Sequence, residues 1–194
     1  MLVMQFHGKL LGTIRKCLKP IASDLILVGD NFPLNGGKSD ELLKYVSTNW
    51  NRVFVVPGLT EIIGVEPSSF TTNIDELQKF LLTSPRSNVY MLNNSEFHDG
   101  NHMIVGSTFW CGSNSKISEP QTRILANWAK DDAEFIGTSI KMAVTHNKIL
   151  TVATYFPNNN LSPAVQHIMR KHLEGLDIKQ NIGKWVSGYN YPLM

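Results

Sequence analysis

The sequence predicts an α/β fold built as a two-sheet sandwich flanked by helices. Short apolar runs alternate with stretches of helical periodicity, which is the pattern of a layered α/β domain. The strand-like runs fall into two groups, before and after Thr108, and this grouping predicts two sheets. A chain of 194 residues, 42% hydrophobic and 18% charged, is long and apolar enough to bury a sizeable core. We therefore predict a single domain over residues 1–194.

The N-terminal half is expected to supply buried strands and two helices. The runs at 24–28 and 53–56 are near-continuously apolar, which is typical of strands buried on both faces. A further strand is predicted at 2–6. One helix is predicted over 39–46, with Ser39 as its N-cap, and a second helix opens at 72 and extends to about 81.

The C-terminal half is expected to alternate strands with two more helices. The turn at Asp99-Gly100 predicts that the strands on either side of it form a hairpin or lie as neighbours. Helices are predicted over 120–130, with a proline in the first turn, and over 162–172. The predicted strands are 88–92, 102–106, 140–145 and 184–187.

The net charge, the two cysteines and the N-terminal segment bear on the partners and the location of the protein. The net charge of +2 neither indicates nor excludes a nucleic-acid partner. Cys17 and Cys111 are interpreted as two buried thiols rather than as part of a disulfide framework or zinc knuckle. The apolar segment 1–6 is short and is followed by His7, so it predicts neither a signal peptide nor a membrane span. We expect an intracellular protein.

Five predicted strand ends carry conspicuous residues. In an open α/β sheet, functional groups gather in the loops beyond the carboxyl ends of the strands. Taken singly, each of these ends is typical of an ordinary turn, so the interpretation depends on the order of all five. They are Gln5-Phe6-His7, Gly29-Asp30-Asn31, Pro57-Gly58-Leu59-Thr60-Glu61, Thr145-His146-Asn147 and Ser187-Gly188-Tyr189-Asn190-Tyr191.

This ordered series resembles the calcineurin-like metallophosphoesterases. Strand ends in that family carry Asp-x-His, Gly-Asp, Gly-Asn-His-Glu, Thr-His and Gly-His-x-His, in that order. The resemblance covers almost the whole chain and implies a sandwich of metallophosphoesterase type, whose motifs hold two metal ions that clamp a phosphate and activate a water. The segments that carry the resemblance are 24–30, 53–61 with two substitutions, 89–93 and 104–110.

The resemblance also implies that most of the metal site is lost. Of seven ligand positions, three match the family, and they are His7, Asp30 as the bridging carboxylate, and His146. The other four are substituted, as Gln5, Leu59, Tyr189 and Tyr191. The family's catalytic histidine corresponds to Thr60, whereas Glu61, which supports the ligands in that family, is retained.

This loss is severe for a site that must hold two divalent ions. Leu59 offers no lone pair, and a tyrosine with a pKa near 10 is a poor ligand beside the imidazole that it replaces. We expect no metal cofactor, with His7, Asp30 and His146 as remnants hydrogen-bonded to each other and to neighbouring loops. The alternative is one weakly held divalent ion, such as manganese or zinc, at these three residues, because two histidines and one carboxylate can bind a single metal.

The C-terminal region adds a second departure from the family. Family members continue past the last motif with further strands, whereas this sequence ends at Met194, so the resemblance implies a reduced second sheet. The edge of that sheet is either covered by a partner or simply smaller. Tyr189 and Tyr191 suit a protein interface as well as packing over an emptied metal site. The glycine-rich turn at 35–38 is interpreted as a plain loop rather than an anion-binding nest.

Three functional hypotheses follow. The favoured one is a catalytically inactive pseudoenzyme that serves as a structural or protein-binding component, with an unidentified protein partner. By analogy, such a component suits the particle or an assembly of a large DNA virus, which would make the protein virion-associated. The alternative is a residual phosphoesterase that acts on a phosphomonoester or phosphodiester with one metal ion but without an evident general acid. A third hypothesis is a module that binds phosphate or nucleotide without turnover.

Overall fold

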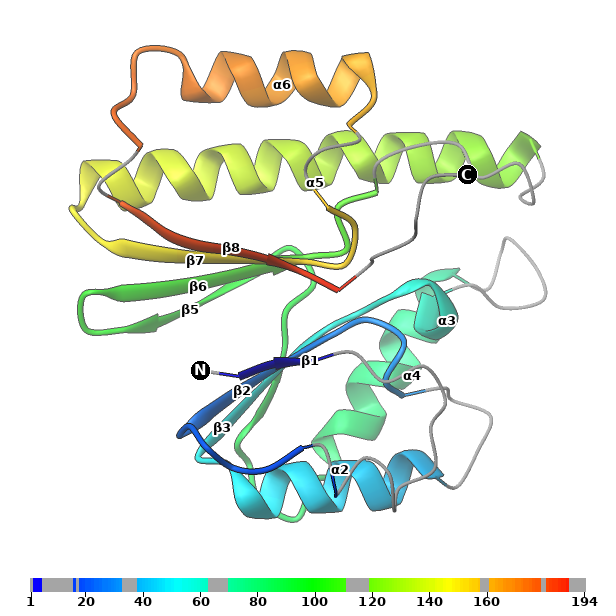
Figure 1. The fold of residues 1–194 in the computed structure, drawn as a ribbon. Helices are drawn as coiled ribbons and strands as arrows, with labels where there is room; N and C mark the ends of the chain where they lie inside the picture. Colours follow the sequence, from blue (N-terminus) through cyan, green and yellow to red (C-terminus); the bar gives the residue numbers. More distant parts are fainter. Residues whose placement is uncertain are drawn as a thin grey trace. The chain divides into compact units, whose positions relative to one another are not determined.

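The computed structural model describes residues 2–4, 16, 18–32, 38–62, 70–110, 119–157, 161–178 and 181–188. The chain divides into two compact units, Met1–Leu92 and Asn93–Met194. Each unit combines one four-stranded sheet with helices, so the fold is mixed α/β with two sheets (Figure 1). The two units are described in turn.

The first unit is built on a parallel sheet of order β1-β2-β3-β4. Strands β2 and β3 lie side by side along their whole length, with Leu25 opposite Val53 and Leu27 opposite Val55. The elements are β1 (Leu2–Met4), β2 (Asp24–Val28), α2 (Lys38–Asn49), β3 (Arg52–Val56), α3 (Leu59–Ile62), α4 (Phe70–Leu82) and β4 (Val89–Met91).

Helices α2 and α4 contribute to one core with alternate residues of β2 and β3, which point to the same face because side chains alternate along a strand. This core fixes the sheet, and with it the ends of β2 and β3 where polar residues gather. Its strand and helix members include Leu25, Leu27, Val53, Val55, Leu42, Leu43, Val46, Leu77 and Leu81.

The second unit is built on a sheet of order β5-β6-β7-β8, in which β5 and β6 form an antiparallel hairpin and the other pairs are parallel. Helix α6 packs on the long helix α5, and Figure 1 shows α6 on the side of α5 away from the sheet. The elements are β5 (Ser95–Asp99), β6 (His102–Ser107), α5 (Glu119–Thr145), β7 (Ile149–Thr154), α6 (Pro163–Leu173) and β8 (Ile182–Ser187).

Most of the predicted elements are confirmed. Strands β2 and β3 and helices α2, α4 and α6 lie where apolar runs and helical periodicity placed them, and β8 contains the predicted strand 184–187. The start of α6 follows from its sequence, because the Ser162 side chain accepts a hydrogen bond from the backbone N–H of Val165 and Pro163 occupies the first turn. Of the predicted strand 2–6, residues 2–4 form β1, and residues 5 and 6 lie outside the described residues.

The predicted strand at 140–145 is wrong, because these residues form the last turns of α5 and the strand follows as β7. Ile136, Ile140 and Ala143 are all buried and recur at helical spacing. A window of six residues, four of them apolar, does not distinguish this pattern from a buried strand. The predicted helix 120–130 is therefore only the first part of a helix of 27 residues.

The predicted pairing of 88–92 with 102–106 is also wrong. Strand β4 belongs to the first sheet, whereas β6 pairs with β5, a strand that the sequence analysis missed. The sequence of β5, Ser-Glu-Phe-His-Asp, is too polar to show the alternation of a half-buried strand. Consequently the strands divide between the two sheets at Leu92 rather than at Thr108. The single domain over residues 1–194 stays a prediction.

None of the helices in the described part of the chain has the length and apolar character that crossing a membrane requires. Cys17 and Cys111 lie outside the described residues, as do residues 35–37 of the predicted loop, and Lys38 begins α2.

Candidate functional site

The candidate site is formed where β2 and β3 end in the first unit. Directly after β2, Gly29 and Asp30 both adopt left-handed backbone conformations, with φ of 62° and 55°. This conformation is uncommon for a residue other than glycine, and it reverses the chain sharply. The backbone N–H of Gly29 still donates to the carbonyl of Val56, at 2.8 Å, so the turn starts from the end of the sheet.

Glu61 of α3 holds this turn with its buried carboxylate. The residue is only 1% exposed. Its Oε1 atom accepts the backbone N–H groups of Asn31, at 2.6 Å, and Phe32, at 2.9 Å. Its Oε2 atom accepts those of Asp30, at 2.8 Å, and Gly58, at 3.0 Å. Four backbone donors that would otherwise be buried without a partner are therefore satisfied by one side chain.

Gly58 allows the loop after β3 to approach the turn after β2 at backbone distance. A Cβ atom at this position would lie 2.6 Å from both the nitrogen of Asp30 and the Cα atom of Gly29, and 2.8 Å from a carboxylate oxygen of Asp30. Because two of these atoms belong to the backbone, no rotamer change could relieve the clash. The close packing of the two loops thus requires a glycine at position 58.

Asp30 directs its carboxylate to the start of α3. Its Oδ1 atom accepts hydrogen bonds from the backbone N–H and from the hydroxyl of Thr60, both at 2.9 Å. The side-chain amide of Asn31 donates to the carbonyl of Gly29, at 2.6 Å. Asp30 and Asn31 are both buried. The two loops are therefore joined by Glu61 in one direction and by Asp30 in the other.

The electrostatics of the site follow from its burial. Removal from water raises the pKa of the Glu61 carboxyl, and the negative charge of Asp30 raises it further, whereas the backbone N–H groups of Phe32, Asp30 and Asn31 lower it. In the ionised state each oxygen of Glu61 accepts two N–H groups, an arrangement that a neutral amide or a protonated carboxyl cannot reproduce.

The structure brings together some of the predicted site residues. Leu59, Thr60 and Glu61 begin α3 next to Asp30, as the order of the motifs predicted. Glu61 accepts the backbone N–H groups of Asp30 and of the two residues that follow it. Gln5, His7, Tyr189 and Tyr191 lie outside the described residues.

His146 is placed differently from the expectation. It follows the last turn of α5, where its Nδ1 atom lies 2.9 Å from the carbonyl oxygen of Met142, and it belongs to the second unit. The match to the family's Thr-His motif required a position at the end of a parallel strand. The strand in question is β7, and Tyr155 and Phe156 follow it instead.

Sequence reasoning missed a second buried carboxylate, Asp132 of α5. Its Oδ1 atom accepts the side-chain amide of Asn94, at 2.7 Å, and its Oδ2 atom accepts the backbone N–H of Trp110, at 3.2 Å. Phe109, which lies in the same segment after β6, has a left-handed φ of 55°. A signal for this residue exists, because a helix extended to 145 places Asp132 on the buried face between Ala129 and Ile136.

The environment of Asp132 perturbs its ionisation. Burial raises the pKa of this carboxyl from its ordinary value of 3.8 to about 6, although hydrogen bonds from Asn94, Trp110, Ser107 and Phe109 lower it. The aromatic side chains of Trp128 and Phe156 pack around Trp110, with ring centroids at 6.3 and 5.3 Å from it. Asp132 thus anchors the end of β6 within an aromatic cluster.

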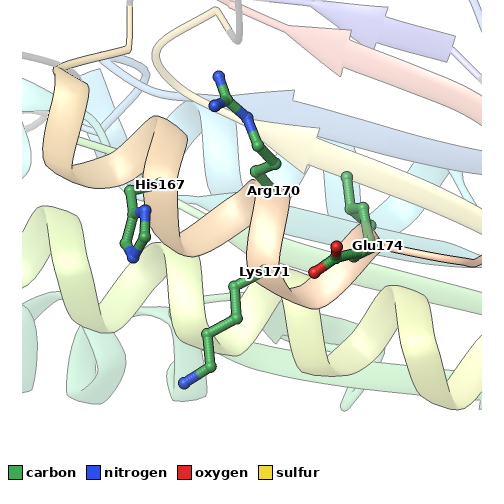
Figure 2. Close-up of a pocket in the computed structure, with 5 residues that line it drawn as sticks. His167, Arg170, Lys171 and Glu174 are labelled. Carbon is green, nitrogen blue, oxygen red and sulfur yellow. The ribbon is translucent and has the colours of Figure 1, made fainter.

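A shallow hollow lies on the outer side of α6. It has a volume of about 480 Å³, and all five of its described lining residues come from this helix and the residue after it, namely His167, Arg170, Lys171, Leu173 and Glu174. Figure 2 shows Arg170 and Lys171 extending in different directions rather than converging on one point. Among the residues that the structure describes, the lining therefore supplies neither opposing walls nor a focused charge.

Within the described residues, no group of three or more His, Cys, Asp or Glu side chains is placed to hold a metal ion. No protein-family model matches the sequence, no curated protein matches it, and no solved structure matches the fold.

The Glu61 network predicts that an isosteric substitution of Glu61 strongly lowers the stability of the protein. Glu61→Gln replaces one acceptor oxygen by an NH₂ group that faces two backbone donors, so two buried N–H groups lose their partner. We expect the free energy of unfolding, measured by urea denaturation at neutral pH, to fall by about 2–4 kcal/mol. Glu76→Gln, an exposed change on α4, is the matched control and should cost less than about 0.5 kcal/mol. Equal effects of the two changes would contradict an ionised Glu61.

Asp132 predicts a pH dependence of stability. Because its pKa is raised in the folded state, the folded protein binds more protons than the unfolded chain between about pH 4 and pH 6, and stability falls as pH rises through this window. Full ionisation costs about 3 kcal/mol. Asp132→Asn should remove this part of the slope in urea titrations at several pH values. Since burial also raises the pKa of Glu61, the test is the difference between the two proteins, and parallel profiles would contradict it.

Proposed function

We propose that this chain is a catalytically inactive protein of metallophosphoesterase type that serves as a structural or protein-binding component. One observation carries the proposal. The two carboxylates at the ends of β2 and β3 are engaged by hydrogen bonds within the chain, Glu61 by four backbone N–H groups and Asp30 by the backbone N–H and hydroxyl of Thr60.

The chemistry of the neighbouring residues supports this proposal. A two-metal hydrolytic site needs several anionic or imidazole ligands around the bridging carboxylate. Next to Asp30 the chain offers Leu59, which has no lone pair, and Thr60, whose hydroxyl donates to Asp30 itself. A threonine hydroxyl does not exchange a proton near neutral pH as a catalytic histidine does. The site therefore lacks both a ligand and a general acid at the positions where the family has them.

The metallophosphoesterase type is supported by the positions of two motifs relative to each other rather than by a single motif. The segment 24–30 forms β2 and its turn, and the segment 53–61 forms β3 and the start of α3, so the two motifs lie at neighbouring strand ends. This is the place in an open α/β sheet where a functional site is expected. The Asp30 carboxylate, which would bind metal in an enzyme of this family, instead accepts hydrogen bonds from Thr60 and joins the two loops. This use suits a structural or protein-binding component.

The residual phosphoesterase is the competing proposal, and its proposed ligand set is weakened by the position of His146 on a helix end. Asp30 has a role in both proposals, as the hydrogen-bond partner of Thr60 in the first and as a metal ligand in the second. The most informative variant is therefore Asp30→Asn, which keeps the acceptor for Thr60 but removes the charge that a cation requires.

Metal content and hydrolysis separate the two proposals. The purified chain and Asp30→Asn would be incubated with manganese or zinc, desalted and analysed for metal, and both would be assayed with p-nitrophenyl phosphate and bis(p-nitrophenyl) phosphate. We expect equal, substoichiometric metal and equal background hydrolysis in the two proteins. About one or two ions per chain that disappear in Asp30→Asn, together with hydrolysis that disappears as well, would overturn the proposal.

A further inference from the structure

Helix α6 has few fully buried apolar side chains. Of its 11 residues, Val165 and Met169 are buried. The helix that it packs on is anchored far more extensively, because α5 buries Leu125, Ala129, Ala133, Ile136, Ile140 and Ala143. Elements with few buried apolar side chains open at lower free energy than the core around them. On this ground α6 is expected to be the less stable of the two helices.

One polar contact adds to this attachment. The Nε2 atom of His172, in the last turn of α6, lies 2.5 Å from the Oε2 atom of Glu134 on α5. The imidazole is largely covered, with its side chain 19% exposed, whereas the side chain of Glu134 is 53% exposed. The contact is therefore reachable from solvent on the glutamate side and shielded on the histidine side.

Gly137 makes room for the imidazole. A Cβ atom at this position would lie 2.6 Å from Cγ and 2.7 Å from Cβ of His172. Gly137 follows Glu134 by three residues, so the two lie on the same side of α5, one turn apart. The ring of His172 consequently sits in a slot whose floor is a glycine and whose end is a carboxylate.

We propose that α6 opens and closes on α5 as a unit, without global unfolding, and that His172 in the slot formed by Gly137 and Glu134 is the latch that sets how often it opens. The basis is the combination of two buried apolar anchors with one shape-matched polar contact. Ala133 and Ile140 lie four residues before and three residues after Gly137, and both are fully buried. Opening would uncover this small apolar face of α5 together with Val165 and Met169, and this goes beyond the function proposed above.

Hydrogen exchange measured on the full chain tests the latch. In His172→Ala and in Glu134→Ala, amides of α6 should exchange roughly three- to tenfold faster than in the unmodified chain, because a charge-assisted hydrogen bond is lost. Amides of β6 and β7, the two central strands of the sheet, should keep their rates relative to the unmodified chain. The double variant should show little more than the larger single effect, since both changes remove the same contact.

Lys171→Ala is the matched control, because Lys171 is the exposed neighbour of His172 on the same helix. It should leave the exchange of α6 unchanged. Unchanged exchange of α6 in both latch variants would overturn the proposal, as would an equal acceleration in α6, β6 and β7. Glu134→Ala changes a half-exposed side chain and keeps the test decisive if His172→Ala does not fold.

Discussion

The structure of the candidate site depends on the buried carboxylate of Glu61. The turn after β2 points three consecutive backbone N–H groups inward, and the loop after β3 adds a fourth. Each of these donors would carry a desolvation cost if it were left without a partner. The carboxylate satisfies all four, and the left-handed conformations of Gly29 and Asp30 and the absence of a side chain at Gly58 are the conditions under which they converge.

The second unit uses a related arrangement. Asp132 lies on a helix, is buried, and accepts a backbone N–H from the segment that follows β6, where Phe109 is also left-handed. In both units a helical carboxylate therefore holds the chain where it leaves a strand. Glu61 and Asp132 are thus engaged in maintaining the fold. The proposal of an inactive protein rests on Glu61 together with Asp30, whose carboxylate is engaged in the same way by Thr60.

The sequence predicted much of the first unit and less of the second. Strands β2 and β3 were predicted because both of their faces are apolar, and α6 was predicted because a serine cap and a proline mark its start. Residues 140–145 were misassigned because a short apolar run on a long helix looks like a strand until the whole of α5 is considered. The polar strand β5 gave no alternation to recognise.

The candidate site, too, could be predicted from the sequence only in part. The proximity of Asp30, Thr60 and Glu61 could be predicted, because the ends of adjacent parallel strands meet at one edge of a sheet. The four-donor network could not, since it depends on backbone conformations that composition and spacing do not encode. Asp132 was missed because its helix was predicted to end at 130. His146 was misplaced together with the strand that was thought to carry it.

Chemical rescue of Glu61→Ala is the most direct test of the central claim that an ionised carboxylate joins the two loops. The truncated variant leaves four backbone donors around the space of the lost carboxylate, which a small anion of the same chemistry can enter. The thermal unfolding midpoint of Glu61→Ala would be measured in formate and in chloride at equal ionic strength, with the unmodified chain alongside. The account predicts that formate raises the midpoint of the variant more than that of the unmodified chain. Equal effects of the two salts on the variant would contradict it.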